Sequence, residues 1–456
     1  MGATDTIVAA ATPPGRGGVA IVRVSGTMAP EIAQTLLGAL PVPRVATFSR
    51  WRDAAGDIID SGIAIYFPAP GSFTGEDVLE LQGHAGLIVE ALIDRVVELG
   101  ARRARPGEFS ERAFLNDKID LAQAEAIADL IDAGSRGAAR AAMRSLQGEF
   151  SARVAAARAA LTNLRVYVEA AIDFPEEEID FLESQELRER TQYVRALLDD
   201  VLQAARRGAR LTRGMTVVIA GRPNAGKSTL MNQLAGYDAA IVTPVPGTTR
   251  DPLRVMLEIN GVPVELIDTA GLRATHTACE HAATSDHDAI EAEGIRRARD
   301  AMARADHILY VVDGAADAGA RGFVEEQAAL PQDVPLTLVM NKSDLLGAEK
   351  PVHEPPIIAI SAVTGEGLDA LRARLASAAG HSESAGGSFS ARARHVEALE
   401  RAARQLDAAC QQLALKQGEL AAYELRGAQT SLGEVLGDVS SDELLGHIFG
   451  SFCIGK

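Results

Sequence analysis

Eight consecutive residues near the middle of the chain have the types and spacing that bind phosphate. Residues 221–228 read Gly-Arg-Pro-Asn-Ala-Gly-Lys-Ser, which fits the pattern G-x-x-x-x-G-K-[ST]. The glycines let backbone N–H groups approach phosphate oxygens, and the helix expected to follow adds positive potential at its N-terminus. We expect Lys227 to neutralise the β/γ oxygens and Ser228 to bind Mg²⁺. Alone, the same pattern also fits a chance match in a glycine-rich turn.

Two later segments would complete a triphosphate site. Residues 268–271, Asp-Thr-Ala-Gly, close an apolar run. We expect Asp268 to hold Mg²⁺ through water and the N–H of Gly271 to meet the γ-phosphate. The pair Thr248-Thr249 lies between the two motifs, and one of these threonines is expected to close over Mg²⁺. The predicted Mg²⁺ ligands are Ser228 and Thr249.

A third set of residues predicts recognition of the base. Residues 341–344, Asn-Lys-Ser-Asp, follow another apolar run. A carboxylate has two acceptor oxygens for the two N–H groups on one edge of guanine, and it would face the wrong pattern on adenine. Asp344 therefore predicts GTP rather than ATP, with the Ser361-Ala362 backbone behind the base. Each short motif alone fits a surface turn equally well, but five in order predict a GTP-binding domain.

The complete set of residues predicted to contact GTP comes from these five motifs. They are Asn224, Ala225, Gly226, Lys227, Ser228, Thr229, Thr243, Thr248, Thr249, Asp268, Thr269, Ala270, Gly271, Asn341, Lys342, Asp344, Ser361 and Ala362.

The residues that would activate water are not evident from these motifs. The position after Gly271, where Ras-type proteins carry a glutamine, is Leu272, which cannot orient water. Hydrolysis is then either very slow or assisted by another group. The arginines nearby are better explained as surface residues than as an arginine finger; they are Arg250, Arg273, Arg296 and Arg297.

The elements that must position these motifs follow from hydrophobic patterning. Residues 214–380 alternate apolar runs with helical stretches, which predicts a doubly wound α/β sheet. Asn260-Gly261 reads as a hairpin turn. The expected strands are 215–220, 253–259, 264–267, 308–312, 336–340 and 357–360.

The flanking regions differ from this pattern. Residues 1–118 read as an α+β domain, with strands at 7–9, 19–22 and 63–66 and a helix at 87–99. Residues 119–213 read as helix, with Leu161, Leu164, Val168 and Ile172 at helical spacing. A Gly/Ser-rich linker at 381–390 precedes further helix, where Val396, Leu399, Leu406, Leu413 and Leu420 repeat at bundle-like spacing. We therefore expect 119–213 and 390–456 to form one helical domain into which the GTP-binding domain is inserted.

Bulk properties limit the function classes. The chain has 456 residues, a formal net charge of −17 and three cysteines. Extensive non-specific nucleic-acid binding is disfavoured because it depends on many Lys and Arg side chains, so any RNA contact is local or supplied by a partner. Few, scattered cysteines argue against a disulfide framework. Without a signal-like or membrane-spanning stretch, we expect a cytoplasmic protein with no membrane association.

Several segments outside the GTP motifs resemble one known family. They include 11–18, Ala-Thr-Pro-Pro-Gly-Arg-Gly-Gly, then 80–84, Glu-Leu-Gln-Gly-His, and 105–109, Arg-Pro-Gly-Glu-Phe. The most specific is 452–456, Phe-Cys-Ile-Gly-Lys. On these motifs the chain resembles, essentially end to end, the tRNA modification GTPases of the MnmE (TrmE) family.

The resemblance implies a function and partners. It implies a homodimer formed through the N-terminal domains and a GTPase activated by K⁺ and by dimerisation of its G domains. It also implies a flavoprotein partner, MnmG (GidA), in a heterotetramer or larger complex that adds a carboxymethylaminomethyl or aminomethyl group to carbon five of the wobble uridine of certain tRNAs. The contact with tRNA is expected to come mainly through the partner.

The resemblance also implies residue roles. The K⁺ site would involve Asn224, Thr243, Val245 and Thr248, and the 5-formyl-tetrahydrofolate site Arg23, Glu80, Lys118 and Lys456. Glu291 would position water, although the unusually long stretch at 274–289 leaves Glu293 as the alternative. The catalytic set is then Glu291, Lys227, Thr249 and Gly271. Cys453 would lie beside the folate, as a nucleophile or as a structural thiol.

Three hypotheses remain open from the sequence. The first is a GTPase whose hydrolysis drives tRNA modification. The second is a non-enzymatic GTPase switch in ribosome or RNA assembly. The third is a folate-dependent aminomethyltransferase in which GTP is only regulatory. The folate-like N-terminal domain and the C-terminal cysteine motif favour the first.

Overall fold

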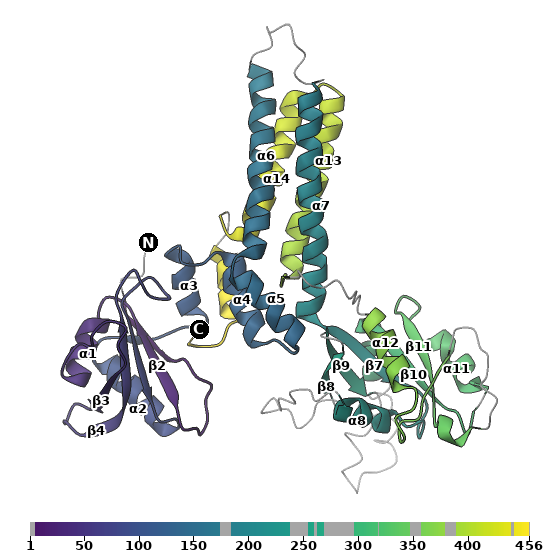
Figure 1. The fold of residues 1–456 in the computed structure, drawn as a ribbon, viewed down its shortest axis with the longest axis horizontal. Helices are drawn as coiled ribbons and strands as arrows, with labels where there is room; N and C mark the ends of the chain where they lie inside the picture. The colour runs from purple at the N-terminus through teal and green to yellow at the C-terminus, as the bar shows by residue number, and fades with distance from the viewer. Residues whose placement is uncertain are drawn as a thin grey trace. The chain divides into compact units, whose positions relative to one another are not determined.

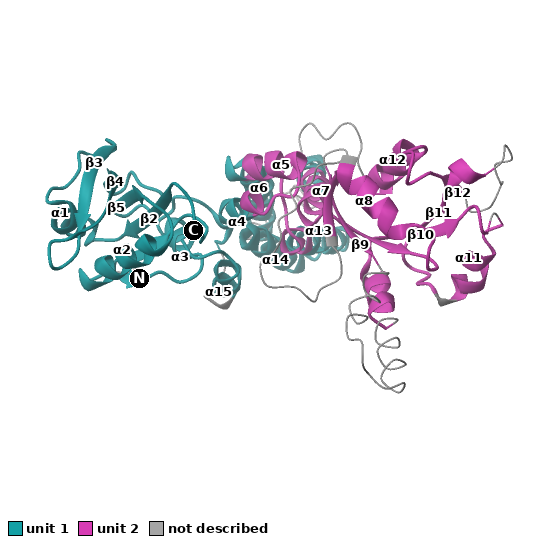
Figure 2. Ribbon diagram, turned by 90° about the horizontal axis from the view of Figure 1, so that it is seen from below, with its two compact units in different colours: residues 1–128, 146–199, 398–456 teal, residues 129–145, 200–397 magenta. Residues whose placement is uncertain are grey.

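The computed structural model describes residues 5–173, 184–237, 254–259, 262–268, 296–317, 319–346, 357–378, 389–438 and 442–455. Internal contacts divide the chain into two compact units. The first comprises 1–128, 146–199 and 398–456, and the second 129–145 and 200–397 (Figure 2). No helix in these described ranges is long and apolar enough to cross a membrane.

The first unit contains a six-stranded sheet in the order β3-β4-β5-β2-β1-β6 (Figure 1). Neighbouring strands are antiparallel, except that β1 and β6 are parallel. The predicted strands and helix in this region are confirmed, whereas β3, β5, β6, α1 and α3 were not predicted. The element bounds are β1 Ile7–Ala10, β2 Ala20–Ser25, α1 Ala29–Leu37, β3 Thr47–Arg52, β4 Ile58–Phe67, β5 Val78–Gly83, α2 Leu87–Glu98, β6 Arg102–Arg103 and α3 Glu108–Leu115.

The two faces of this sheet are covered unequally. One face packs against α1 and α2, with Trp51, Leu79 and Leu81 buried between them. On the other face, Phe109 of α3 packs on Ile7 and Ala9 of β1, and its ring centroid lies 5.8 Å from the Arg23 guanidinium of β2. Farther along, Phe48 and Ile63 lie directly opposite each other on β3 and β4 and are 70% and 40% exposed. Part of the sheet therefore presents apolar side chains to solvent.

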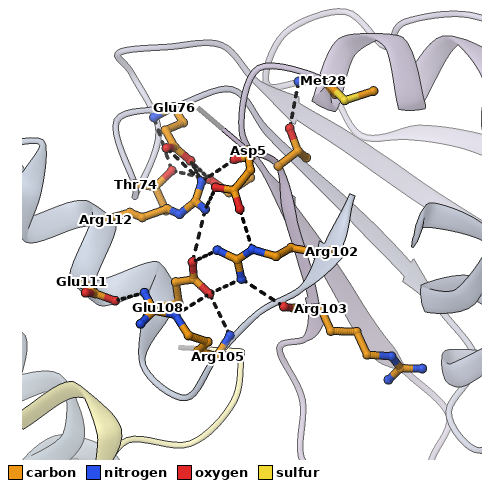
Figure 3. Close-up of polar contacts among 12 residues, drawn as sticks. Asp5, Met28, Thr74, Glu76, Arg102, Arg103, Arg105, Glu108, Glu111 and Arg112 are labelled. Atoms are coloured by element: carbon orange, nitrogen blue, oxygen red, sulfur yellow. Dashed lines mark hydrogen bonds and ion pairs between the residues drawn. The ribbon is translucent and has the colours of Figure 1, made fainter. Parts of the chain in front are cut away.

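A buried charge network fastens α3 to the sheet (Figure 3). Arg112, 3% exposed, donates to Asp5 Oδ1 at 2.8 Å and to Glu108 Oε1 at 3.2 Å. Arg102 donates to both oxygens of Glu108, at 2.8 and 2.5 Å. Burial alone would raise the pKa of the Glu108 carboxyl, but hydrogen bonds from Arg102, the Arg105 amide and Arg112 lower it to about 2.

Long helices make up the rest of the first unit and extend into the second. Four of them are α6 Glu149–Asp173, α7 Gln185–Arg213, α13 Ala393–Ala414 and α14 Gly418–Leu436 (Figure 1). Leu161, Leu164 and Val168 are buried, as their helical spacing predicts. Leu420 is 51% exposed, so its predicted place in a helical core stripe is wrong. The reason is a helix boundary: α13 ends at Ala414 and Leu420 belongs to the next helix.

The C-terminal segment returns to the α+β region of the first unit. Phe449 of helix α15, Asp442–Gly450, and Phe452 just after it pack against α4, Leu121–Ile131. Ile454 then forms an isolated β-bridge with Pro106. A Cβ on Gly455 would lie 1.9 Å from the Ala10 carbonyl oxygen, so only glycine fits there.

The second unit contains the other six-stranded sheet, in the order β12-β11-β10-β7-β9-β8. All neighbouring strands are parallel except the antiparallel pair β8–β9. Helices α8 and α12 cover one face, while α11 and the helical residues 296–304 cover the other. The predicted doubly wound sheet is confirmed. Its elements are β7 Met215–Ala220, α8 Lys227–Tyr237, β8 Arg254–Ile259, β9 Val262–Asp268, β10 His307–Asp313, α11 Arg321–Glu326, β11 Leu336–Asn341, β12 Ile357–Ala359 and α12 Leu368–Ala378.

Candidate nucleotide-binding site

The predicted phosphate loop joins the end of β7 to the start of α8. A Cβ on Gly221 would lie 2.2 Å from the Val311 carbonyl oxygen, and a Cβ on Gly226 would lie 2.2 Å from Asn341 Nδ2. Both glycines also have positive φ, at 134° and 88°. Between them, Asn224 adopts the left-handed conformation with φ 64°. The two glycines are therefore required by close packing as well as by backbone conformation.

Lys227 and Ser228 are the first two residues of helix α8, and their side chains bind different partners. Lys227 Nζ donates to the carbonyl oxygens of Gly221 and Arg222, both at 2.8 Å, so its charge lies inside the loop. Ser228 Oγ donates to Asp268 Oδ2 at 2.7 Å. Asp268, at the end of β9, is buried. The predicted direct ligand Ser228 and the carboxylate expected to hold Mg²⁺ through water are thus adjacent, and oxygen donors of this kind suit a hard divalent cation.

Asn341 joins the phosphate loop to the predicted base-binding loop. Its Nδ2 donates to the Ala225 carbonyl oxygen at 2.9 Å, and its Oδ1 accepts from the Ala362 amide at 2.9 Å. Asn341 is buried. A buried side chain with both ends satisfied fixes the separation of the two loops that it bridges.

Lys342 forms an ion pair that the sequence analysis did not identify. Its Nζ lies 2.6 Å from Asp313 Oδ2, at the end of β10. Burial would raise the pKa of Asp313, but the hydrogen bond from Lys342 and those from the Ala315 and Ala316 amides lower it. The ion pair fixes the position of Lys342, which directly precedes the segment 343–345 that contains Asp344. Asp313 ends an apolar strand next to the phosphate-loop strand, and that position was the available sequence signal.

Asp344 lies in a one-turn helix, Ser343–Leu345, and is exposed. Within the described residues, no hydrogen bond or ion pair engages its carboxylate. The amide of Ser343 donates to the Ile360 carbonyl oxygen at 2.9 Å, and this bond holds the segment against the end of β12. Ser361 is buried and its Oγ accepts from the Thr364 amide. The carboxylate and the Ser361-Ala362 backbone therefore border the same edge of the sheet.

A second interaction missed by sequence reasoning anchors the phosphate loop to α11. Arg222 donates to Glu325 and Glu326, at 2.5 and 2.9 Å. The buried Tyr310 donates its hydroxyl to Glu326 at 2.7 Å. Burial and the bond to Glu326 raise the pKa of Tyr310. Because Arg222 occupies a variable position of the motif, the motif itself gave no signal for this contact.

Some predicted residues lie outside the described part of the chain. The predicted switch residues among them are Thr243, Val245, Thr248, Thr249, Thr269, Ala270 and Gly271. The candidate water-positioning acids Glu291 and Glu293, the stretch 274–289 and Lys456 lie outside it as well. Thr229 is described, and it is exposed in the first turn of α8.

The predicted folate residues are described in the first unit apart from Lys456. Arg23 and Glu80 are opposite each other on β2 and β5 and form an ion pair at 2.9 Å. The Arg23 guanidinium also lies 5.9 Å from the Phe73 ring centroid. Lys118 instead borders Gly75 of the loop that contains Phe73. Cys453 is exposed, and its carbonyl oxygen accepts from the Gly107 amide at 3.4 Å.

The sheet of the second unit and its converging loops define a P-loop nucleotide-binding domain. Comparison with known families places this domain in a larger protein. A family model described as the MnmE helical domain matches residues 121–453, and one described as the GTP-binding protein TrmE N-terminus matches residues 6–118. The chain therefore belongs to the MnmE (TrmE) family of tRNA modification GTPases.

Individual relatives agree over the full length. A protein of Yersinia pseudotuberculosis serotype O:1b (strain IP 31758) is 54% identical over 465 residues, covering 100% of both chains, and is named tRNA modification GTPase MnmE. A protein of Erwinia tasmaniensis with the same name is also 54% identical with complete coverage. Among solved structures, Aquifex aeolicus Era bound to GDP and AlF₄⁻ is 26% identical and covers 42% of this chain and 66% of its own, with a TM-score of 0.28. That superposition is too weak to add to the family assignment.

Proposed function

We propose that this protein hydrolyses GTP and that hydrolysis serves the modification of tRNA. The observation that carries the proposal is the Asn341 bridge, because it ties the phosphate loop to the loop expected to hold guanine. The full-length relatives named as tRNA modification GTPases support the biological role. A cytoplasmic location is part of the same proposal.

The chain's own residues would divide the work on the triphosphate. Lys227 is already desolvated, and we infer that it exchanges its two loop carbonyl partners for β/γ oxygens when nucleotide binds. Ser228 and Asp268 would hold Mg²⁺, directly and through water respectively, with Thr249 as the second direct ligand. The cation supplies charge neutralisation at the β/γ oxygens. Gly271 and Glu291 would bind the γ-phosphate and orient the attacking water.

The proposed K⁺ requirement addresses the missing glutamine at Leu272 and the lack of an arginine finger. A monovalent cation beside the phosphates would neutralise developing charge where an arginine acts in other GTPases. Asn224 is exposed in the phosphate loop, so its side-chain oxygen is available as a ligand. Thr243, Val245 and Thr248 would complete the site between two G domains that activate each other.

The proposed N-terminal functions are dimerisation and folate binding. The exposed apolar pair Phe48 and Ile63 supports an intermolecular contact through the open sheet face. Arg23 and Glu80 offer a cation and a carboxylate side by side, suited to the glutamate tail and the pterin donors of 5-formyl-tetrahydrofolate. Lys118 and Lys456 would add positive charge. The exposed Cys453 stays a candidate thiol beside this site.

The proposal includes two partners, a flavoprotein and tRNA, and it assigns the chain to three domains. The flavoprotein MnmG would bind this homodimer in a heterotetramer or larger complex, and together they would modify carbon five of the wobble uridine. The domain bounds remain a proposal, at 1–118 for the folate and dimerisation domain and 214–380 for the G domain. The helical domain would comprise 119–213 and 390–456.

A non-enzymatic GTPase switch in RNA assembly is the alternative function, because the phosphate-binding and base-binding loops would serve such a switch equally well.

GTP turnover in K⁺ and in Na⁺, with Mg²⁺ present, tests the proposed enzyme. We expect turnover in K⁺ to exceed that in Na⁺ by about tenfold or more. The variant Asn224→Gly keeps the left-handed backbone, removes the ligand and should abolish the difference. Equal rates would remove the K⁺ site, and no affinity for GTP or GDP would overturn the whole function.

A further inference from the structure

Three segments of the second unit are unusually basic for this chain. Residues 133–145, 201–214 and 389–396 contain no aspartate, glutamate or lysine, although the chain as a whole has a net charge of −17. All their positive charge comes from nine arginines: Arg136, Arg140, Arg144, Arg206, Arg207, Arg210, Arg213, Arg392 and Arg394. Such a concentration of one charge attracts anionic molecules where no local counter-charge neutralises it.

The three segments meet in space. The Ser390 amide donates to the Ala141 carbonyl oxygen at 3.0 Å, which places helix α5, Arg136–Leu146, against residues 389–391. Helix α7 packs on the same residues, because a Cβ on Gly208 would lie 2.1 Å from the Phe389 carbonyl oxygen. The first two segments therefore share one support at residues 389–391.

The same two segments also share a support at strand β9. A Cβ on Gly134 would lie 3.3 Å from Pro263 Cβ, and a Cβ on Gly214 would lie 2.8 Å from the Pro263 carbonyl oxygen. Residues 134–141 and 208–214 thus span the same two supports. Helix α5 and the last turns of α7 therefore extend between the same two parts of the second unit.

Five arginines on these two helices are exposed and form no ion pair with any carboxylate in the described ranges. We name them the arginine surface: Arg136, Arg140, Arg207, Arg210 and Arg213. Arg392 differs, because it pairs with Asp129 at 2.8 Å and has a structural partner. On each helix the arginines recur every three or four residues, a rise of about 4.5–6 Å.

We propose that the arginine surface binds the phosphate backbone of the RNA substrate. This inference deepens the proposed tRNA-modification function and rests on it. Guanidinium groups bind phosphate through two parallel hydrogen bonds, and an all-arginine surface suits that geometry better than a mixed one. The residues between the arginines are mostly small, such as Gly137 and Ala139, without the aromatic anchors typical of protein interfaces. An acidic protein partner is therefore the less favoured occupant.

The test compares two charge-matched variants of the full-length protein. One replaces four members of the surface, Arg136→Gln, Arg140→Gln, Arg210→Gln and Arg213→Gln. The control replaces four exposed arginines elsewhere, Arg50→Gln, Arg188→Gln, Arg299→Gln and Arg304→Gln. Affinity for an unmodified transcript of a tRNA with a wobble uridine is measured over a range of KCl concentrations.

We expect the surface variant to lose at least about tenfold in affinity at about 100 mM KCl. The slope of log affinity against log salt should fall by about three, because four phosphate contacts are lost. The control should stay within about twofold of the unmodified protein. The affinity of each variant for GDP shows whether it is folded. If the surface variant does not bind GDP, the double variant Arg207→Gln with Arg210→Gln replaces it, and its tRNA affinity is compared with that of the unmodified protein in the same way.

Equal loss in the two variants, or no loss in either, overturns the proposal. Retained tRNA affinity with loss of the flavoprotein complex also overturns it and identifies a protein-binding surface. If the unmodified protein has no tRNA affinity, the arginine surface is not an RNA site. GTP hydrolysis in the same preparation then shows that the nucleotide function stands independently.

Discussion

At the scale of single residues, the nucleotide site is assembled by contacts between motifs. Gly226 leaves room for Asn341, which in turn bonds Ala225 and Ala362. Pattern matching identified each of these residues separately, because their spacing within a motif is fixed. It could not show that Asn341 bridges two loops or that Asp313 pairs with Lys342, since both contacts join distant parts of the chain.

Asp344 gives a test of base recognition at this scale. The change Asp344→Asn replaces an acceptor oxygen by a donor, so GTP should bind about 10- to 100-fold more weakly. Xanthosine triphosphate should bind in its place, because its edge presents the complementary acceptor. Calorimetry with both nucleotides measures the exchange, and Asp369→Asn, on the exposed surface of α12, is the control. Unchanged nucleotide preference would contradict the guanine assignment.

His307 gives a test of pH dependence. It is 1% exposed, its Nε2 lies 2.9 Å from Thr337 Oγ1, and Nδ1 has no hydrogen-bond partner among the residues that the structure describes. Burial, and then the charge of Arg374, lowers the pKa of His307 to about 4. The unfolded chain binds this proton near pH 6.5, so stability is full above that pH and declines as pH falls toward 4.

The expected loss between pH 7 and pH 5 is about 2 kcal/mol for the second unit. Hydrogen exchange of the β10 and β11 amides measures it, since the single tryptophan, Trp51, lies in the other unit. His307→Gln keeps a donor for Thr337 and removes the titration, so its stability should change less over this range. The same pH dependence in both proteins would assign the effect to other groups.

At the scale of elements, continuous apolar strands were predicted, whereas the edge strand β3 and the interior strand β5 were missed. The predicted strand 215–220 coincides with β7, because a buried parallel strand is a continuous apolar run. Strand β3 reads Thr-Phe-Ser-Arg-Trp-Arg, and its exposed arginines and half-covered face hide the alternation. Strand β5 does alternate, with Leu79 and Leu81 buried and Glu80 and Gln82 on the other face, and the sequence analysis did not use this signal.

The network around α3 gives a prediction for an element. Glu108→Gln leaves Arg102 and Arg112 without their shared carboxylate in a buried site, and should cost roughly 3 kcal/mol of the stability of the first unit. Glu111→Gln is the matched control in the same helix, because its partner Arg105 is exposed, and should cost less than about 1 kcal/mol. Denaturant titration followed by Trp51 fluorescence measures both. Similar losses would show that the network contributes no more than a surface ion pair.

At the scale of the whole molecule, the chain interrupts a helical region with a nucleotide-binding sheet. Residues 200–397 belong to one contact unit, while 146–199 and 398–456 belong to the other. Helices α7 and α13 therefore continue from one unit into the other and link the two units covalently. The sequence predicted the insertion from the change of hydrophobic period, but the unit boundary within both helices follows only from three-dimensional contacts.

This architecture leads to a prediction about tRNA. If hydrolysis drives modification through these helices, a strain that lacks the protein should have unmodified wobble uridines, and Lys227→Ala should fail to restore them. The reason is that Lys227 supplies the positive charge within the phosphate loop. Nucleoside analysis of total tRNA from the complemented strains is the measurement. Arg304→Ala, on the exposed surface of the same unit, should restore modification fully.

The outcomes separate the three functions. Unchanged nucleosides in the deletion strain would favour an assembly switch, because such a protein acts on RNA only by timed binding. Full modification by Lys227→Ala would favour a folate-dependent transferase in which GTP is regulatory. The third outcome is loss of modification with Lys227→Ala while Trp51 fluorescence shows that the first unit is still folded. This outcome supports modification driven by hydrolysis, because only in that case does chemistry in one unit depend on the phosphate loop of the other.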